Sequence, residues 1–321
     1  MLSSFQKTIL ITGGTTGLGY HCALNLARKH PKYQIIIASR TDRERSADKI
    51  NSILKQDNVR YMRLDLGSLA EVRSFAAGWA EKQFPPIQAL LLNAGLSILD
   101  VRHTVDNFEM TFGVNHIGHA LLFDLLVPCL TEDARVVVTS SGTHDPAKKT
   151  GLPDAKYISA EELAHPSPES LEQNSGRQRY ASSKLANVLW TYALHRRFQS
   201  LKTKKWTVVA MDPGLMPGTN LARSVSAPLR FLWFRVLPNI LPLLRLLISP
   251  NIHSPQESAE ALAWLATSPD MQGISGKYFE GKSEIKSSED SYNERKQEDL
   301  WAWTVKTVSR DEEEAKRFEI V

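Results

Sequence analysis

The stretch RQRYASSKLAN, at 177–187, places a weak acid beside a cation. Tyr180 and Lys184 stand four positions apart, and the apolar residues that follow at helical spacing indicate that this stretch opens a helix. Side chains at positions i and i+4 leave the same face of a helix, so the phenol and the ammonium are expected to lie together. A surface tyrosine packed on a lysine stem gives the same pattern, and the other motifs of the chain must decide between the two.

The elements that would position this pair alternate between strand and helix. Helices are predicted from Leu18 to about His30, through Ile50 and Leu54, at 69–83, at 105–130 and around Tyr180. This rhythm predicts an α/β fold with a doubly wound parallel sheet, the Rossmann fold. The predicted strands are KTILIT (7–12), YQIIIAS (33–39), VRYMRLDL (59–66), IQALLLNAG (87–95), ARVVVTSSG (134–142), WTVVAMDPG (206–214) and GKYFEG (276–281).

No linker or repeat interrupts the rhythm, so we predict a single domain over 1–282. It carries a polar insertion at 142–178 and an apolar, basic segment at 215–253. The charged extension at 283–321 contains DLWAW, which predicts a helix packed on the domain.

Composition excludes several classes of protein. Of 321 residues, 42% are hydrophobic and 23% charged, as in a soluble globular protein, and a net charge of +4 is too small for a nucleic-acid surface. Cys22 and Cys129 lack metal-ligand spacing and indicate a reducing compartment. His116 and His119 have no third ligand in view, so we expect packing or polar contacts and no metal. The N-terminus runs directly into a strand, which predicts a cytoplasmic protein.

The first strand runs into glycines and then into a helix, in ILITGGTTGLGY. Such a turn brings backbone N–H groups and the positive end of a helix against a diphosphate, and a side chain at a close-approach glycine would collide with it. Glycines also serve ordinary turns, but the strand, turn and helix here favour dinucleotide binding. The candidate residues at this turn are Gly13, Thr15, Thr16, Gly17, Leu18 and Gly19.

The end of the second strand indicates which dinucleotide binds. The acid that holds a ribose diol should fall about 20 residues past the glycines, where the chain has Ser39 followed by Arg40. A guanidinium pairs with a 2′-phosphate, where a carboxylate would repel it. We therefore predict NADP(H); Arg40 as a solvated loop residue is the alternative, and the nearby Asp42 complicates the choice.

Together these motifs resemble the short-chain dehydrogenase/reductase family, from Thr8 to about Gly281. The NHIGHALL stretch and the late tyrosine look most like the branch of retinol dehydrogenases and protochlorophyllide reductases. The matching motifs are TGGTTGLG, LDL, LNAG, NHIGH, VVVTSSG, YASSK and DPG. The resemblance implies adenine contacts at Asp65 and Leu66, cofactor contacts at Asn93, Ala94, Gly95, Tyr180 and Lys184, and a segment flanking the nicotinamide at Pro213, Gly214 and Thr219.

The resemblance also implies a catalytic set of Asn115, Ser141, Tyr180 and Lys184. Tyr180 would protonate the carbonyl oxygen as hydride arrives, with Lys184 and an oxidised nicotinamide lowering the pKa of its phenol. Lys184 would also bind the nicotinamide ribose, and Asn115 would hold a relay water. Ser141 would stabilise the oxygen; because it stands 39 positions before Tyr180, Ser140 stays open as the catalytic serine.

The leading functional prediction is an NADP(H)-dependent oxidoreductase that interconverts an alcohol and a carbonyl on an apolar small molecule. Two alternatives are a C=C double-bond reductase of the protochlorophyllide reductase type and a non-catalytic NADP(H)-binding regulator. The substrate, the direction and the oligomeric state are not predicted.

The segment at 221–253 lies where the family carries its substrate lid. Its apolar part holds Arg230, Arg235 and Arg245, and Pro238 and Pro242 interrupt a single helix, so a membrane span is disfavoured. Two interpretations remain: an apolar lid over a lipophilic substrate, and a lid that also makes peripheral contact with a membrane surface.

Overall fold

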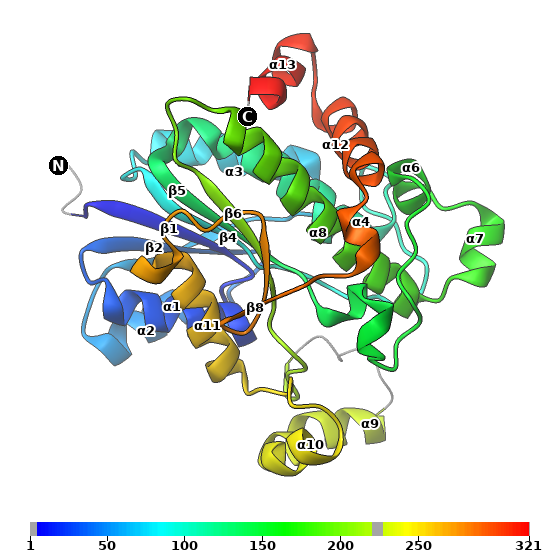
Figure 1. Cartoon of the computed structure of the whole chain (residues 1–321). Coiled ribbons are helices and arrows are strands. Elements are labelled where there is room, and N and C mark those ends of the chain that lie inside the picture. Colours follow the sequence, from blue (N-terminus) through cyan, green and yellow to red (C-terminus); the bar gives the residue numbers. More distant parts are fainter. Residues whose placement is uncertain (1–4, 220–226, 321) are drawn as a thin grey trace.

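The computed structural model describes residues 5–219 and 227–320 and places them in one eight-stranded sheet (Figure 1). The strand order is β3-β2-β1-β4-β5-β6-β7-β8, with all neighbours parallel except the last pair. The order reverses beside β1, so the carboxyl ends of β1 and β4 flank the crevice in which such folds bind ligands. The strands are β1 Lys7–Thr12, β2 Tyr33–Ser39, β3 Val59–Arg63, β4 Ile87–Leu92, β5 Leu130–Thr139, β6 Thr207–Asp212, β7 Lys277–Glu280 and β8 Ser283–Ile285.

Helices cover both faces of the sheet (Figure 1). Successive side chains of a buried strand point to opposite faces, so in β1 Ile9 and Ile11 pack toward α1 and α11, while Leu10 packs with α3, α5 and α8. The longer helices are α1 Gly17–Lys29, α2 Ser46–Leu54, α3 Leu69–Glu81, α5 Gly118–Leu126, α8 Gly176–Ser200, α11 Pro255–Thr267, α12 Glu294–Val308 and α13 Glu312–Ile320. The shorter ones are α4 Met110–Phe112, α6 Ala160–Ala164, α7 Pro168–Gln173, α9 Ala227–Phe231 and α10 Leu241–Leu247.

The α/β class and the parallel Rossmann sheet are confirmed, and three details differ from the sequence prediction. The helix predicted at 105–130 begins only at Met110 and holds a π-helical turn, η1 Gly113–Ile117. Tyr180 lies in the second turn of its helix, because α8 begins at Gly176. The helix α11 and the antiparallel strand β8 were not predicted.

The C-terminal extension packs on the sheet's helical layer. The helix α12 contacts α8 and α6 (Figure 1). Trp301 is buried, with the Arg197 guanidinium 3.9 Å from its ring centroid, and Asp299 accepts a hydrogen bond of 2.7 Å from the Tyr157 hydroxyl. The division of the chain at residue 282 stays a prediction.

The segment at 215–253 forms the short helices α9 and α10, which lie outside the two helical layers (Figure 1). Positions 220–226 of this segment fall outside the described residues. Among the residues that are described, one helical stretch, Met110–Cys129, is long and apolar enough to cross a membrane, and 78% of that stretch is buried in the protein core.

Candidate active site

The glycine-rich turn has the shape that a diphosphate requires. Gly13 and Gly17 adopt φ of +68° and +53°, and a Cβ on Gly19 would lie 2.4 Å from the Gly13 carbonyl oxygen. Thr16 is the N-cap of α1, but its side chain makes no capping hydrogen bond, so the first amides of the helix lack that partner. Leu18 is buried at the start of the helix. A compact turn with glycines at its points of close approach, against an uncapped helix N-terminus, fits an anionic group.

Thr12 connects this turn to the end of β4. Its hydroxyl oxygen accepts hydrogen bonds of 2.9 Å from the backbone N–H groups of Asn93 and Ala94, and the Asn93 amide donates to the Thr12 carbonyl at 2.8 Å. A Cβ on Gly95 would lie 3.3 Å from the Lys184 Nζ. The NAG motif therefore joins the candidate cofactor turn to the Tyr–Lys pair.

The residues at the end of β2 leave a guanidinium accessible. Thr15 donates a hydrogen bond of 3.1 Å to the Ser39 hydroxyl. The Asp42 carboxylate accepts from the backbone N–H of Ser46 at 2.8 and 2.9 Å, at the beginning of α2. Arg40 is exposed and has no ion pair within the described residues. The Asp42 carboxylate is thus held at the start of α2 and forms no ion pair with Arg40.

On the other side of β2, Asp65 and Leu66 follow β3. The Asp65 carboxylate accepts a hydrogen bond of 2.9 Å from the Gly67 N–H, and Leu66 is buried. Gly118 packs directly on this turn, since a Cβ there would lie 2.3 Å from the Leu66 carbonyl oxygen. The predicted adenine contacts thus lie on a loop fixed against the helical stretch that carries Asn115.

Asn115 lies within the π-helical turn η1 and is 1% exposed. Its amide donates to the Leu96 carbonyl at 3.0 Å and to the Ser183 hydroxyl at 3.0 Å, while its carbonyl oxygen accepts from the Leu96 N–H at 2.9 Å. These bonds tie η1 to α8 and to the loop after β4. The role of Asn115 in holding a water stays a prediction.

The two serines at the end of β5 point in different directions. The buried Ser140 donates a hydrogen bond of 2.8 Å to the Lys184 backbone carbonyl. Burial raises the pKa of the Tyr180 phenol, and the nearby Ser141 hydroxyl opposes part of this rise. Ser141 is therefore the better candidate of the two to contact a substrate oxygen beside Tyr180, and its catalytic role stays a prediction.

We expect Ser141→Ala to lower kcat by about 10²- to 10³-fold, the usual effect of removing one stabilising donor. Ser140→Ala is the matched control, expected to lower the free energy of unfolding by about 1 kcal/mol through the lost hydrogen bond while kcat changes much less. Steady-state kinetics and urea unfolding of both variants check this. A larger fall in kcat for the Ser140 variant would exchange the two roles.

Tyr180 and Lys184 are both buried, and burial dominates their pKa values. The Lys184 Nζ donates to the Thr139 carbonyl at 3.0 Å and lies 5.7 Å from the Tyr180 ring centroid. Burial lowers the pKa of Lys184 to about 8, and the carboxylate of Asp212 opposes this change. Burial raises the pKa of Tyr180 well above its usual value, which differs from the lowering expected from Lys184. The protein by itself therefore holds Tyr180 neutral, the form that donates a proton.

Asp212 is a residue near the pair that the sequence analysis did not single out. It ends β6, is 3% exposed, and accepts hydrogen bonds from the Gly214 N–H at 2.9 Å and the Asn251 amide at 2.8 Å. Its charge raises the pKa of both Tyr180 and Lys184. Its position in the DPG motif was the available signal, but only the proline and glycine of that motif were used.

The remaining predicted residues lie beside Asp212. The Pro213 carbonyl accepts from the Ser258 hydroxyl at 2.6 Å, and Gly214 adopts a φ of +75°. Thr219 lies near the glycine-rich turn, because a Cβ on Gly17 would be 3.8 Å from its methyl group. These contacts bring the DPG segment and the cofactor turn to the same edge of the sheet.

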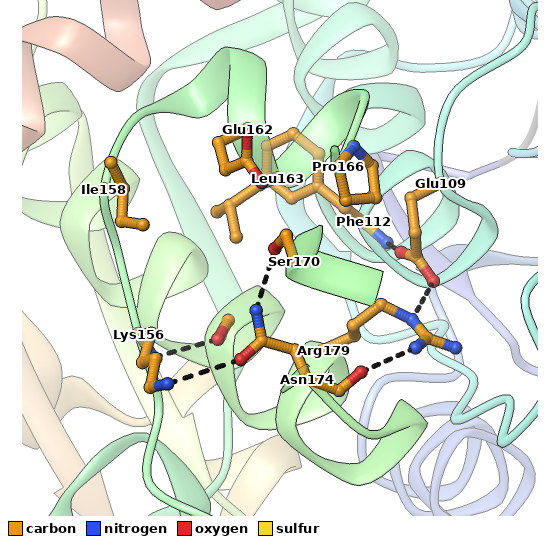
Figure 2. Close-up of a pocket in the computed structure, with 11 residues that line it drawn as sticks. Glu109, Phe112, Lys156, Ile158, Glu162, Leu163, Pro166, Ser170, Asn174 and Arg179 are labelled. Atoms are coloured by element: carbon orange, nitrogen blue, oxygen red, sulfur yellow. Dashed lines mark hydrogen bonds and ion pairs between the residues drawn. The ribbon is translucent and has the colours of Figure 1, made fainter. Parts of the chain in front are cut away.

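A small pocket is lined by residues of α4, α6, α7 and α8 and of the loops between them (Figure 2). Arg179 faces it, and its guanidinium bonds Glu109 at 3.1 Å, the Asn174 carbonyl at 3.0 Å and the carbonyls of Leu99 and Asp100 at 3.2 and 3.0 Å. Through these four hydrogen bonds Arg179 ties the start of α8, and with it Tyr180, to the loop after β4 and to Glu109. The pocket lining is Glu109, Phe112, Lys156, Ile158, Glu162, Leu163, Pro166, Ser170, Asn174, Arg179 and Ser182.

His116 and His119 have separate polar partners. His116 bonds the Thr304 hydroxyl at 3.0 Å, and His119 bonds the Thr12 hydroxyl at 2.8 Å and the Asn115 carbonyl at 3.1 Å. Burial lowers the pKa of His116 to about 3 and that of His119 to about 4. Both imidazoles are therefore neutral at pH 7 and act as polar connectors between helices and the cofactor turn.

A doubly wound sheet with a glycine-rich first turn and a Tyr–Lys pair beside it is the arrangement of a dinucleotide-dependent oxidoreductase. The sequence profile of the short chain dehydrogenase family matches residues 7–150. Human polyprenol dehydrogenase is 32% identical over 305 residues, covering 92% of this chain and 83% of that protein. Human retinol dehydrogenase 14 is 33% identical over 291 residues, covering 85% and 77%. The chain belongs to the short-chain dehydrogenase/reductase family, in the branch similar to retinol dehydrogenases.

Solved structures agree on the fold. An uncharacterized protein from Mycobacterium paratuberculosis superposes with a TM-score of 0.68 at 26% identity, covering 95% of this chain and 94% of that one. The angucycline C-6 ketoreductase LanV, solved with bound NADP, superposes with a TM-score of 0.60 at 19% identity, covering 87% and 96%. Membership of the short-chain dehydrogenase/reductase family, shown by the relatives above, makes the protein an oxidoreductase of small molecules in a family that uses nicotinamide cofactors.

Proposed function

We propose that the protein is an NADP(H)-dependent oxidoreductase that interconverts an alcohol and a carbonyl on an apolar small molecule. The observation that carries the proposal is the buried Tyr180 phenol, which lies beside the Lys184 ammonium and is close enough to the Ser141 hydroxyl for that hydroxyl to oppose the rise of its pKa. A neutral phenol next to a hydroxyl donor can hold a carbonyl oxygen by two hydrogen bonds and protonate it.

The residues divide the work as follows. The turn around Gly13 and Gly19 and the first turn of α1 would hold the diphosphate of the cofactor, whose nicotinamide would supply or accept the hydride. Ser141 stabilises the charge that develops on the substrate oxygen, and Tyr180 donates the proton to that oxygen. Lys184 donates to the Thr139 carbonyl and keeps a positive charge beside the phenol. In the oxidative direction Tyr180 takes the proton back.

Two features support an apolar substrate, and a hydrogen bond places the second of them near the site. Two relatives carry the names polyprenol dehydrogenase and retinol dehydrogenase, and both names denote lipophilic alcohols. The segment at 215–253 is rich in apolar residues, and the Trp233 indole donates a hydrogen bond of 3.0 Å to the Thr219 carbonyl. Trp233 therefore anchors this lid next to the candidate nicotinamide end of the site.

The test is NADPH oxidation against a panel of retinoid, steroid, aromatic and long-chain isoprenoid carbonyls, with the product identified by mass and by NMR. We expect the corresponding alcohol. A product reduced at a C=C bond would favour the double-bond reductase, and binding of NADPH without turnover of any carbonyl would favour a non-catalytic regulator.

Arg40→Asp tests the choice of cofactor. A charge-assisted hydrogen bond contributes about 1.5 to 3 kcal/mol, so we expect NADPH affinity to fall by about ten- to a hundredfold while NADH affinity changes little. Arg43→Asp is the matched control on the same exposed loop. Fluorescence titration with both cofactors measures the effect. Equal weakening of NADPH and NADH would show that Arg40 is structural and would overturn the assignment.

A further inference from the structure

The short helices of the lid expose apolar side chains to solvent. On α10, Leu243, Leu246 and Leu247 are three and four positions apart and so share one face; Leu246 is 81% exposed. Ile248 follows at the end of the helix, and Phe231, at the end of α9, is 65% exposed. We call these five residues the apolar lid face.

These side chains do not point into the protein. The lid has a separate set of inward contacts: Leu244 is buried, Trp233 bonds the Thr219 carbonyl, and Arg245 bonds the Ile252 carbonyl and Glu257, both at 2.6 Å. A lid that covers a substrate therefore accounts for the side chains that face inward. It does not account for the five exposed residues of the apolar lid face. A patch of this kind marks an interaction surface.

The charges around the apolar lid face have one sign. Arg230 and Arg235 are exposed and have no ion pair within the described residues. The sequence holds no Asp or Glu from 220 to 256. Exposed apolar side chains with unpaired arginines beside them are the composition of an interfacial helix on an anionic membrane.

We propose that the apolar lid face docks on the surface of an anionic lipid membrane, with Leu246, Leu247 and Phe231 among the acyl chains and Arg230 and Arg235 at the headgroups. A second copy of this chain is a poorer occupant, because a two-fold interface would bring the same arginines of both copies together. The docked lid gives a lipophilic substrate a path from the bilayer to the site without crossing water. The docking itself does not depend on the proposed reaction.

The experiment is co-sedimentation of the purified full chain with vesicles. One set contains phosphatidylcholine alone, and the other contains phosphatidylcholine with about 30% phosphatidylserine; both are measured at low and high salt. We expect binding to the anionic vesicles that weakens as salt rises, because the arginines contribute through an electrostatic attraction that salt screens. Salt-insensitive binding to both vesicle types, or binding to neither, overturns the proposal.

Two pairs of variants separate the two contributions. Arg230→Ala with Arg235→Ala should weaken anionic-vesicle binding by about 25-fold, since each arginine near an anionic surface contributes about fivefold. Leu246→Ser with Leu247→Ser should weaken it by about tenfold or more. The matched controls are Lys202→Ala with Lys205→Ala and, among exposed apolar residues elsewhere, Val105→Ser.

Sedimentation velocity tests whether a second copy of this chain, and not a membrane, occupies the apolar lid face. The proposal is overturned if the wild-type protein forms a dimer and does not bind vesicles, and if Leu246→Ser with Leu247→Ser dissociates that dimer. The apolar lid face would then be a self-association surface. NADPH binding by each variant verifies that it is folded. Because vesicle binding needs no turnover, it can succeed or fail independently of the proposed oxidoreductase activity.

Discussion

Replacing Tyr180 with Phe is expected to lower kcat by about 10²- to 10⁴-fold, the range that a positioned acid or base contributes. The phenyl ring keeps the volume of a side chain that is 6% exposed, so the fold and the cofactor site should persist. What is lost is the phenol hydroxyl, which is the proposed proton donor. Steady-state NADPH oxidation and NADPH titration measure the two effects separately.

Tyr192→Phe is the matched control for this variant. Tyr192 lies on the same helix, is buried to the same degree, and bonds the Ser287 hydroxyl at 2.6 Å, away from the candidate site. Its replacement should lower the free energy of unfolding by about 1 kcal/mol and leave kcat near that of the wild type. If Tyr180→Phe behaves like Tyr192→Phe, Tyr180 is a structural residue and the acid/base assignment is wrong.

The central sheet could be predicted because its signal is local. The strands at 7–12 and 33–39 are continuous β-branched runs bounded by turn residues, and the structure gives them the predicted bounds. The helix α11 also had a local signal that was overlooked: Ser254 and Glu257 form a capping box just ahead of an alanine-rich run. The residue composition of α11 is as typical of a helix as that of the helices that were predicted.

Other features depend on contacts between distant parts of the chain, which a single sequence does not display. The π-helical turn that holds Asn115 lies where Gly118 packs on the Leu66 backbone. Arg179 and Asp212 form hydrogen bonds with groups far away in sequence. Arg179 bonds the loop after β4, and Asp212 bonds Asn251. The pKa of Tyr180 likewise depends on burial, which the spacing of Tyr180 and Lys184 could not reveal.

Lys184→Met is expected to lower kcat by orders of magnitude and, at the same time, to stabilise the cofactor-free protein at pH 7. Burial lowers the pKa of Lys184 to about 8 from an unfolded value of 10.5, so the folded state holds this charge at a cost. A shift of that size corresponds to at most about 3 kcal/mol at pH 7. The lost hydrogen bond to the Thr139 carbonyl offsets part of it, by about 1 kcal/mol.

The pH dependence of the stability difference between the wild type and the Lys184→Met variant shows whether the buried charge causes that difference. Between pH 8 and 10.5 the unfolded chain binds more protons at Lys184 than the folded protein does, so the contribution of this group to stability becomes more favourable as pH rises. The advantage of the Met variant should therefore be complete below pH 8 and shrink toward pH 10. Urea unfolding at pH 7 and pH 9.5 measures it, with the exposed Lys202→Met as control. A difference that stays constant with pH would mean that packing, and not the buried charge, separates the two proteins.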